Sequence, residues 1–128
     1  MKRDMDLVRE LLLKIAEADE PPNFSALIPN RKKGTQEYAL AAYHMKMLIN
    51  EVGLVKGIDV CSQDGDDWLA LELTWSGQDF LETVRDPTTW RVTKERVKKI
   101  GGATFEMVID IAKAVMKAEA KKRLGLDL

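Results

Sequence analysis

The chain has 128 residues, a length that suits one compact domain with an appended element. Its hydrophobic fraction of 45% and charged fraction of 32% are typical of a globular protein. The net charge of −1 does not favour a dedicated nucleic-acid binder, and the single cysteine, Cys61, excludes an internal disulfide framework and a cysteine-based zinc site.

The hydropathy of the chain predicts no association with a membrane. The opening MKRDMDLVRE is charged and lacks the apolar core of a signal peptide. No stretch approaches the roughly 20 apolar residues that a membrane span needs. We therefore expect a cytoplasmic protein.

The first predicted helix begins after Asp4 or Asp6, either of which can cap it. Its apolar residues recur at helical spacing. They are Met5, Val8, Leu11, Leu12 and Ile15. Pro21 and Pro22 stop the helix. Residues 18–34 are then predicted to be irregular, with FSALIP as a candidate short strand and NRKKG as a turn.

The second predicted helix is capped by Thr35 and ends at Gly53. Its expected buried stripe is Ala41, Met45, Leu48 and Val52. A hairpin follows, because Asp64-Gly65 lies between the apolar runs LVKGIDV and DWLALEL. Strict alternation in the second run predicts two faces. Leu69, Leu71 and Leu73 would share one face, and Trp68, Ala70 and Glu72 the other.

Three further helices are predicted in the rest of the chain. Thr74 caps the first, which Asp86-Pro87 ends, and the basic segment TTWRVTKERVKKI forms the second, up to Gly101-Gly102. Thr104 opens the last. Its apolar face is wider than one packing partner requires. The residues of this face are Phe105, Val108, Ala112 and Val115, widened by Ile111, Ala114 and Ala118.

The order helix, loop, helix, β-hairpin, helix is that of a winged-helix protein. The segment LTWSGQDFL matches the way such proteins often leave the hairpin, with Leu-Thr-x-x-Gly at its start. In this segment Thr74 would cap the helix, and Gly77 would permit a close approach of two backbones. We therefore expect an α+β, mainly α fold. A winged-helix-like domain would span residues 1–86, with a C-terminal helical extension over 87–128 that packs on it or forms a dimer interface.

Several segments together resemble an uncharacterised bacterial and prophage family, a domain of unknown function. They are the opening MKRDMDLVRELLLKI, AYHMKMLINEVGLV, LTWSGQDFLETVRDPTTW and KKIGGATFEMV. The resemblance spans most of the chain and implies a winged-helix-like fold, with no established activity or functional residue. PPNFSALIPNRKKG departs from the common winged-helix pattern, in which a regular helix occupies this place.

One hypothesis is a transcription-associated protein that binds double-stranded DNA. Gln, Asn and Lys side chains can contact base edges in a major groove, and a preceding basic turn can hold phosphates. The proposed base-contacting residues are Gln36, Tyr43, Lys46 and Asn50, and the proposed phosphate-binding residues are Arg31, Lys32 and Lys33. The alternative is a solvated helix face beside a basic turn.

A second hypothesis is a protein-protein interaction module without DNA binding. The predicted hairpin is acidic, which would repel phosphates at short range and suits a basic protein partner. The proposed contact residues are Asp64, Asp66 and Asp67 in the hairpin and Ile111, Val115 and Ala118 in the last helix, which could pair with a second copy. Residues Thr88–Arg123 carry ten basic against four acidic side chains. This excess fits either a binding surface or two exposed helix faces.

The remaining candidate residues offer weaker evidence for a functional site. His44 has no nucleophile or acid partner in any motif, and Cys61 is expected to be a partly buried structural residue. Trp68, Trp75 and Trp90 are expected to be core or boundary anchors. DVCSQDGDD lacks the ligand spacing of a calcium loop. We therefore expect no enzyme, no metal, no cofactor and no small-molecule substrate.

Overall fold

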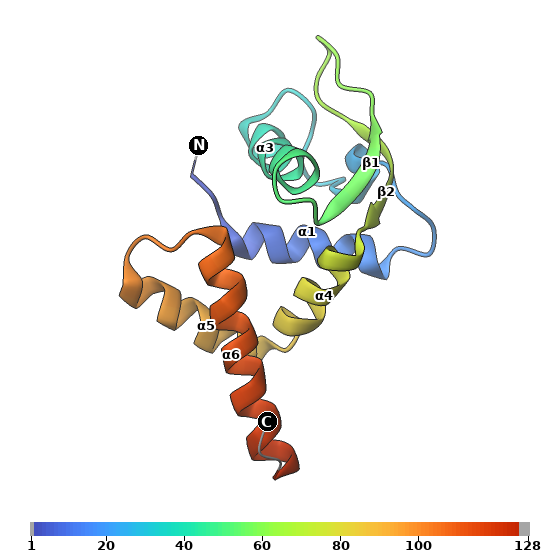
Figure 1. Ribbon diagram of the computed structural model, residues 1–128. Coiled ribbons are helices and arrows are strands. Elements are labelled where there is room, and N and C mark those ends of the chain that lie inside the picture. Colours follow the sequence, from blue (N-terminus) through green and yellow to red (C-terminus); the bar gives the residue numbers. More distant parts are fainter. Residues whose placement is uncertain (1, 126–128) are drawn as a thin grey trace. The chain divides into compact units, whose positions relative to one another are not determined.

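The computed structural model describes residues 2–125. The chain divides into two compact units, Met1–Gln78 and Asp79–Leu128. The helices and strands, coloured along the chain in Figure 1, are α1 (Met5–Glu17), α2 (Phe24–Leu27), α3 (Gln36–Asn50), β1 (Val55–Asp59), β2 (Trp68–Leu73), α4 (Trp75–Val84), α5 (Pro87–Ile100) and α6 (Phe105–Leu124). The boundary between the units falls inside α4, and the fold is the expected α+β, mainly α arrangement.

Helix α1 begins where the sequence predicts. The Asp4 carboxylate accepts hydrogen bonds from the amides of Asp6 (3.0 Å) and Leu7 (3.2 Å), which satisfies two N–H groups that lack partners within the helix. The apolar stripe is buried, and it packs against α3 and β2 in the first unit. Four of the five predicted residues are buried, namely Val8, Leu11, Leu12 and Ile15, while Met5 is half-buried and Leu7, which was not predicted, completes the stripe.

The segment FSALIP is not a strand, contrary to the prediction. It forms α2, a single helical turn after Asn23, and this short helix stands where the winged-helix order expects its second helix. Phe24 lies edge-on between two core rings, with centroids 5.4 Å from Tyr38 and 5.2 Å from Trp68. Just before α2, the Pro22 carbonyl accepts the Leu71 amide at 2.8 Å, so this segment pairs with the edge of β2 through one backbone bond.

Helix α3 is capped by Thr35, whose hydroxyl accepts the amide of Tyr38 at 3.2 Å. The buried residues include three of the four predicted, Ala41, Met45 and Leu48. Val52 is exposed, contrary to the prediction, because the helix ends at Asn50. The chain then turns through Gly53, which has a left-handed φ of 66°.

Strands β1 and β2 pair antiparallel, but the predicted alternation along β2 is wrong. Trp68 and Leu71 are both buried although they are three residues apart. The reason is a bulge: Ala70 adopts a φ of 51°, and Gly57 of β1 faces two residues of β2. The extra residue shifts the alternation of inward and outward side chains by one position for the residues that follow it in β2. The predicted turn is present, with the amides and carbonyls of Ser62 and Gly65 exchanging two hydrogen bonds at 3.0 and 3.1 Å.

The passage from β2 into α4 confirms the roles predicted for Thr74 and Gly77. The Thr74 hydroxyl donates to the Gly53 carbonyl (2.6 Å) and accepts the Gly77 amide (3.1 Å). A Cβ added at Gly77 would overlap the carbonyl of Leu54, so only glycine fits here. Phe80 and Leu81 of α4 are buried.

In the second unit, α5 and α6 pack against each other. Asp86-Pro87 was predicted to end α4, but α4 already ends at Val84, and Asp86 caps α5 by accepting the Thr88 amide at 3.1 Å. Gly101, with a φ of 79°, ends α5 as predicted. Thr104 caps α6. The four predicted core residues of α6 are buried, namely Phe105, Val108, Ala112 and Val115.

Candidate nucleic-acid interface

The four residues proposed to contact bases form one row on α3. Gln36, Tyr43, Lys46 and Asn50 are separated by seven, three and four residues, which places them on one side of a helix, and all four are exposed. The opposite side of α3 is buried. The structure therefore brings these four residues together on one exposed side of α3, as the sequence predicts.

The basic turn before α3 is largely engaged with the protein itself. The Arg31 guanidinium donates to the Glu37 carbonyl at 2.9 Å, and the Lys33 ammonium lies 3.2 Å from the Asp67 carboxylate. Lys32 is exposed, and within residues 2–125 its side chain has no ion-pair partner. Two of the three proposed phosphate-binding groups thus already have acceptors.

The carboxylates of the hairpin lie against the same surface. Asp66 is 3.4 Å from Lys46, and its carbonyl accepts the Tyr38 hydroxyl at 2.6 Å. Asp67 accepts the amides of Ser25 (3.1 Å) and Trp68 (2.9 Å). From the sequence, the basic residues were assigned to a DNA-binding surface and the acidic residues to a protein-binding surface. The structure places them in contact, where each neutralises the other.

The protonation of this cluster follows from its contacts. Burial by itself would raise the pKa of Asp67, but hydrogen bonds from Ser25, Lys33 and Trp68 outweigh it and hold the pKa below 3.8. Burial and the nearby carboxylates of Asp67 and Asp66 raise the pKa of Tyr38 to about 12. Asp67 is therefore charged and Tyr38 neutral near pH 7, as their contacts require.

The net charge of the first unit opposes phosphate binding. Residues 1–78 contain nine Lys and Arg against thirteen Asp and Glu, a net charge of −4. Residues 79–128 contain eleven against eight, a net charge of +3. Non-specific affinity for DNA comes mainly from cations that replace its counterions. The winged-helix-like unit has no such excess.

His44 and Cys61 have structural roles. His44 is fully buried; its Nε2 accepts the Asp4 amide at 2.7 Å, and its Nδ1 donates to the Leu40 carbonyl at 2.8 Å. These partners assign the proton to Nδ1, and they fix the start of α1 to α3. Burial, with a smaller contribution from Asp59, raises the pKa of the Cys61 thiol to about 11, which disfavours the reactive thiolate.

The exposed apolar side chains on the hairpin and at the start of α4 were not predicted from the sequence. Ile58 is 59% exposed and Val60 41% exposed, both on the hairpin, and Trp75 is 86% exposed at the first position of α4. Trp68 and Trp90 are buried, as predicted, but the prediction for Trp75 is wrong.

The predicted interface on α6 is only partly a surface. Val115 is buried within the chain, Ile111 is half-buried, and Ala118 is exposed. A homodimer through α6 stays a prediction. Because Val115 is buried, it contributes nothing to the exposed face through which α6 would pair. Within residues 2–125, no helix is long and apolar enough to cross a membrane, and no group of three or more His, Cys, Asp or Glu side chains is placed to hold a metal ion.

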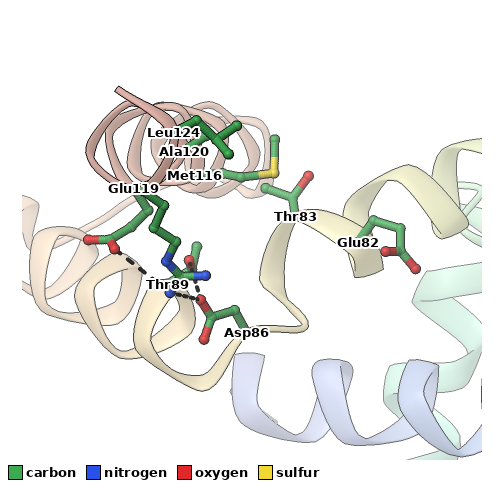
Figure 2. Close-up of a pocket in the computed structure, with 9 residues that line it drawn as sticks. Glu82, Thr83, Asp86, Thr89, Met116, Glu119, Ala120 and Leu124 are labelled. Carbon is green, nitrogen blue, oxygen red and sulfur yellow. Dashed lines mark hydrogen bonds and ion pairs between the residues drawn. The ribbon is translucent and has the colours of Figure 1, made fainter. Parts of the chain in front are cut away.

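A cavity of about 290 Å³ lies in the second unit, between the end of α4, the start of α5 and the end of α6 (Figure 2). Met116, Ala120 and Leu124 of α6 face it, together with Thr89 and Asp86. Its polar groups satisfy one another. Arg123 lies 3.0 Å from Asp86 and 3.9 Å from Glu119, and Thr89 donates to Asp86 at 3.4 Å. In the part of the chain that the structure describes, this cluster leaves no charged group free to recognise a ligand.

The chain is a mainly helical α+β protein, and the elements of its first unit follow the winged-helix order. The chain belongs to the family described as Hypothetical protein (DUF2513), whose model matches residues 2–104. It is similar to an uncharacterised protein of Haemophilus influenzae, with 31% identity over 125 residues that cover 98% of this chain and 100% of that protein. No solved structure matches the chain. The predicted resemblance to a family of unknown function is therefore confirmed.

Proposed function

We propose that the chain is a protein-interaction module on a winged-helix-like scaffold, and that its hairpin contacts a basic partner. The observation that carries this proposal is the pairing of Asp66 and Asp67 with Lys46 and Lys33. This pairing neutralises the cations that a DNA-binding wing and helix would need. The first unit, which contains these ion pairs, has a net charge of −4.

The hairpin offers the chemistry of a protein contact. Ile58 and Val60 supply exposed apolar area, and Asp59 and Asp64 beside them are exposed carboxylates. Interfaces between proteins commonly combine an apolar centre with a polar rim. Acidic residues in the rim select a partner that carries Lys or Arg at the facing positions.

Site-specific photo-crosslinking in cells tests this surface. A photoreactive residue at position 58 is expected to give a discrete crosslinked product, and Asp64→Lys in the same chain should weaken that product by opposing the partner's charge. Position 10 on the exposed side of α1 serves as the control site. Equal crosslinking at positions 58 and 10, or a product unaffected by Asp64→Lys, would count against the proposal.

A second candidate function is binding of double-stranded DNA through α3. The specific observation in its favour is the exposed row of Gln36, Tyr43, Lys46 and Asn50. The ion pairs that cover Lys46 and Lys33 are partly exposed, and such pairs contribute only about 0–1 kcal/mol, so phosphates could displace them. In this candidate the chain acts as a transcription-associated protein.

Fluorescence anisotropy with a duplex containing a selected site tests this candidate. Gln36→Ala with Asn50→Ala should relax the preference among sequences, because each good pairing of a side chain with a base edge supplies about 1–3 kcal/mol of discrimination. Glu10→Ala, on the exposed side of α1, is the control. A sequence preference that survives the double substitution would refute base recognition by α3.

A further inference from the structure

Helix α5 is the most basic element of the chain. It carries five basic side chains and a single acidic one, Glu95, a net charge of +4 over 14 residues. The basic side chains are Arg91, Lys94, Arg96, Lys98 and Lys99. The side of α5 that carries Thr89, Trp90 and Thr93 is buried within the chain. The cations therefore occupy the outward part of the helix, away from its packed side.

Most of these cations are not neutralised by the protein. Arg91 pairs with Glu95 at 3.3 Å, and the Lys94 ammonium lies 5.8 Å from the centre of the Trp90 ring. Among residues 2–125, Arg96, Lys98 and Lys99 have no ion-pair partner, and all three are exposed. This contrasts with the first unit, where Lys33 and Lys46 are paired with carboxylates.

The electrostatics of the helix itself explain only part of this arrangement. Lys98 and Lys99 lie in the last turn of α5, where the helix dipole stabilises positive charge by about 0.3–1 kcal/mol each. Arg91, Lys94 and Arg96 lie outside the last turn and gain no such stabilisation. The helix dipole therefore does not account for the cations that precede the last turn of α5.

We propose that the exposed face of α5 binds the phosphate backbone of double-stranded nucleic acid, without contact to specific bases. This site goes beyond the hairpin interaction and is separate from the row on α3. Lysine is a point charge that suits phosphate, and each phosphate contact releases condensed counterions. The exposed cations of α5, although Glu95 lies among them, offer several such contacts at once.

The composition of this face disfavours other anionic occupants. A helix that lies on a membrane surface buries an apolar face in the lipid, but Trp90 of α5 is already buried within the protein. A protein partner usually needs apolar or aromatic anchors at the centre of the contact, where lysine is depleted. The outward positions from Arg91 to Lys99 are charged, apart from half-buried Val92 and Val97, and Ile100 at the end of α5 is a single exposed apolar side chain.

Two double variants of equal charge test the proposal in the full chain. Lys98→Gln with Lys99→Gln removes two charges from α5. Lys113→Gln with Lys117→Gln removes two exposed lysines from α6, which also lack ion-pair partners within residues 2–125. Anisotropy with a mixed-sequence duplex, measured over a salt series, gives the affinity of each. Circular dichroism and thermal unfolding show whether each variant is folded.

The expected result is salt-sensitive duplex binding that depends on α5. The α5 variant should lose about tenfold in affinity at low salt and flatten the slope of log affinity against log salt by roughly 2, and the α6 variant should change affinity less than about twofold. Equal losses in both variants, or no duplex binding at low salt, would overturn the proposal. So would stronger binding to poly-glutamate or to anionic vesicles, which would point to an acidic protein or a lipid surface instead.

Discussion

The backbone at Gly77 lies so close to Leu54 that a Cβ at position 77 would overlap the Leu54 carbonyl oxygen and stand 2.9 Å from its carbonyl carbon. This contact joins the start of α4 to the start of β1. The Leu54 carbonyl also accepts the Thr74 amide at 3.0 Å, so the two segments have little freedom to separate.

We expect Gly77→Ala to lower the free energy of unfolding by about 3 kcal/mol, because overpacking against backbone forces the backbone to shift. Urea denaturation measures the change. Gly102→Ala is the matched control, since a Cβ at Gly102 meets nothing within 4 Å and its φ is not left-handed. A Gly77→Ala variant as stable as Gly102→Ala would show that the two segments are not held at this distance.

The second prediction concerns His44, whose two ring nitrogens are both engaged. His44→Phe keeps a buried ring but leaves the Asp4 amide without its acceptor at Nε2. The expected loss of stability is about 0.5–1.5 kcal/mol, the usual net contribution of one hydrogen bond, because the Asp4 amide is only part-buried. Hydrogen exchange should show faster exchange at the Asp4 amide, while Asn50→Ala, on the exposed side of α3, should leave that amide unchanged.

The third prediction is the pH dependence of Asp67. Its folded pKa lies below 3.8, so the charged form stabilises the fold above the unfolded pKa, and this stabilisation is lost as pH falls through the folded pKa. Denaturation from about pH 5 to about pH 3 should show a steeper loss in the wild type than in Asp67→Asn. Asp64→Asn in the exposed turn is the control. Identical slopes for the wild type and Asp67→Asn would refute a stabilising role for the Asp67 charge.

What the sequence predicts well is set by local chemistry. Asp4, Thr35 and Thr104 cap their helices as expected, because an N-cap needs only a side-chain oxygen and the amides two or three residues later. The close approach at Gly77 was predicted from the resemblance of LTWSGQDFL to the Leu-Thr-x-x-Gly segment of winged-helix proteins, and it is present. The fold class followed from these elements in order.

The sequence failed where the outcome depends on distant residues. Nothing local marks Ala70 as left-handed, and its bulge reversed the predicted faces of β2. The candidate site failed in the same way. Arg31, Lys32 and Lys33 look available for phosphate in the sequence, but Lys33 meets a carboxylate 34 residues away, at Asp67. Ion pairs between separate segments leave no periodic signal.

The last prediction concerns the strain at Ala70. A non-glycine residue in the left-handed region costs about 1–2 kcal/mol, and glycine removes this cost while adding about 0.5–1 kcal/mol of unfolded-state entropy. Ala70→Gly should therefore raise the free energy of unfolding by up to about 1 kcal/mol. Ala70→Val should lower it, because a β-branched side chain tolerates this conformation least. Urea denaturation of the three chains gives the order Gly, Ala, Val, and a reversed order would mean that residue 70 does not hold the bulge that places Trp68 and Leu71 together in the core.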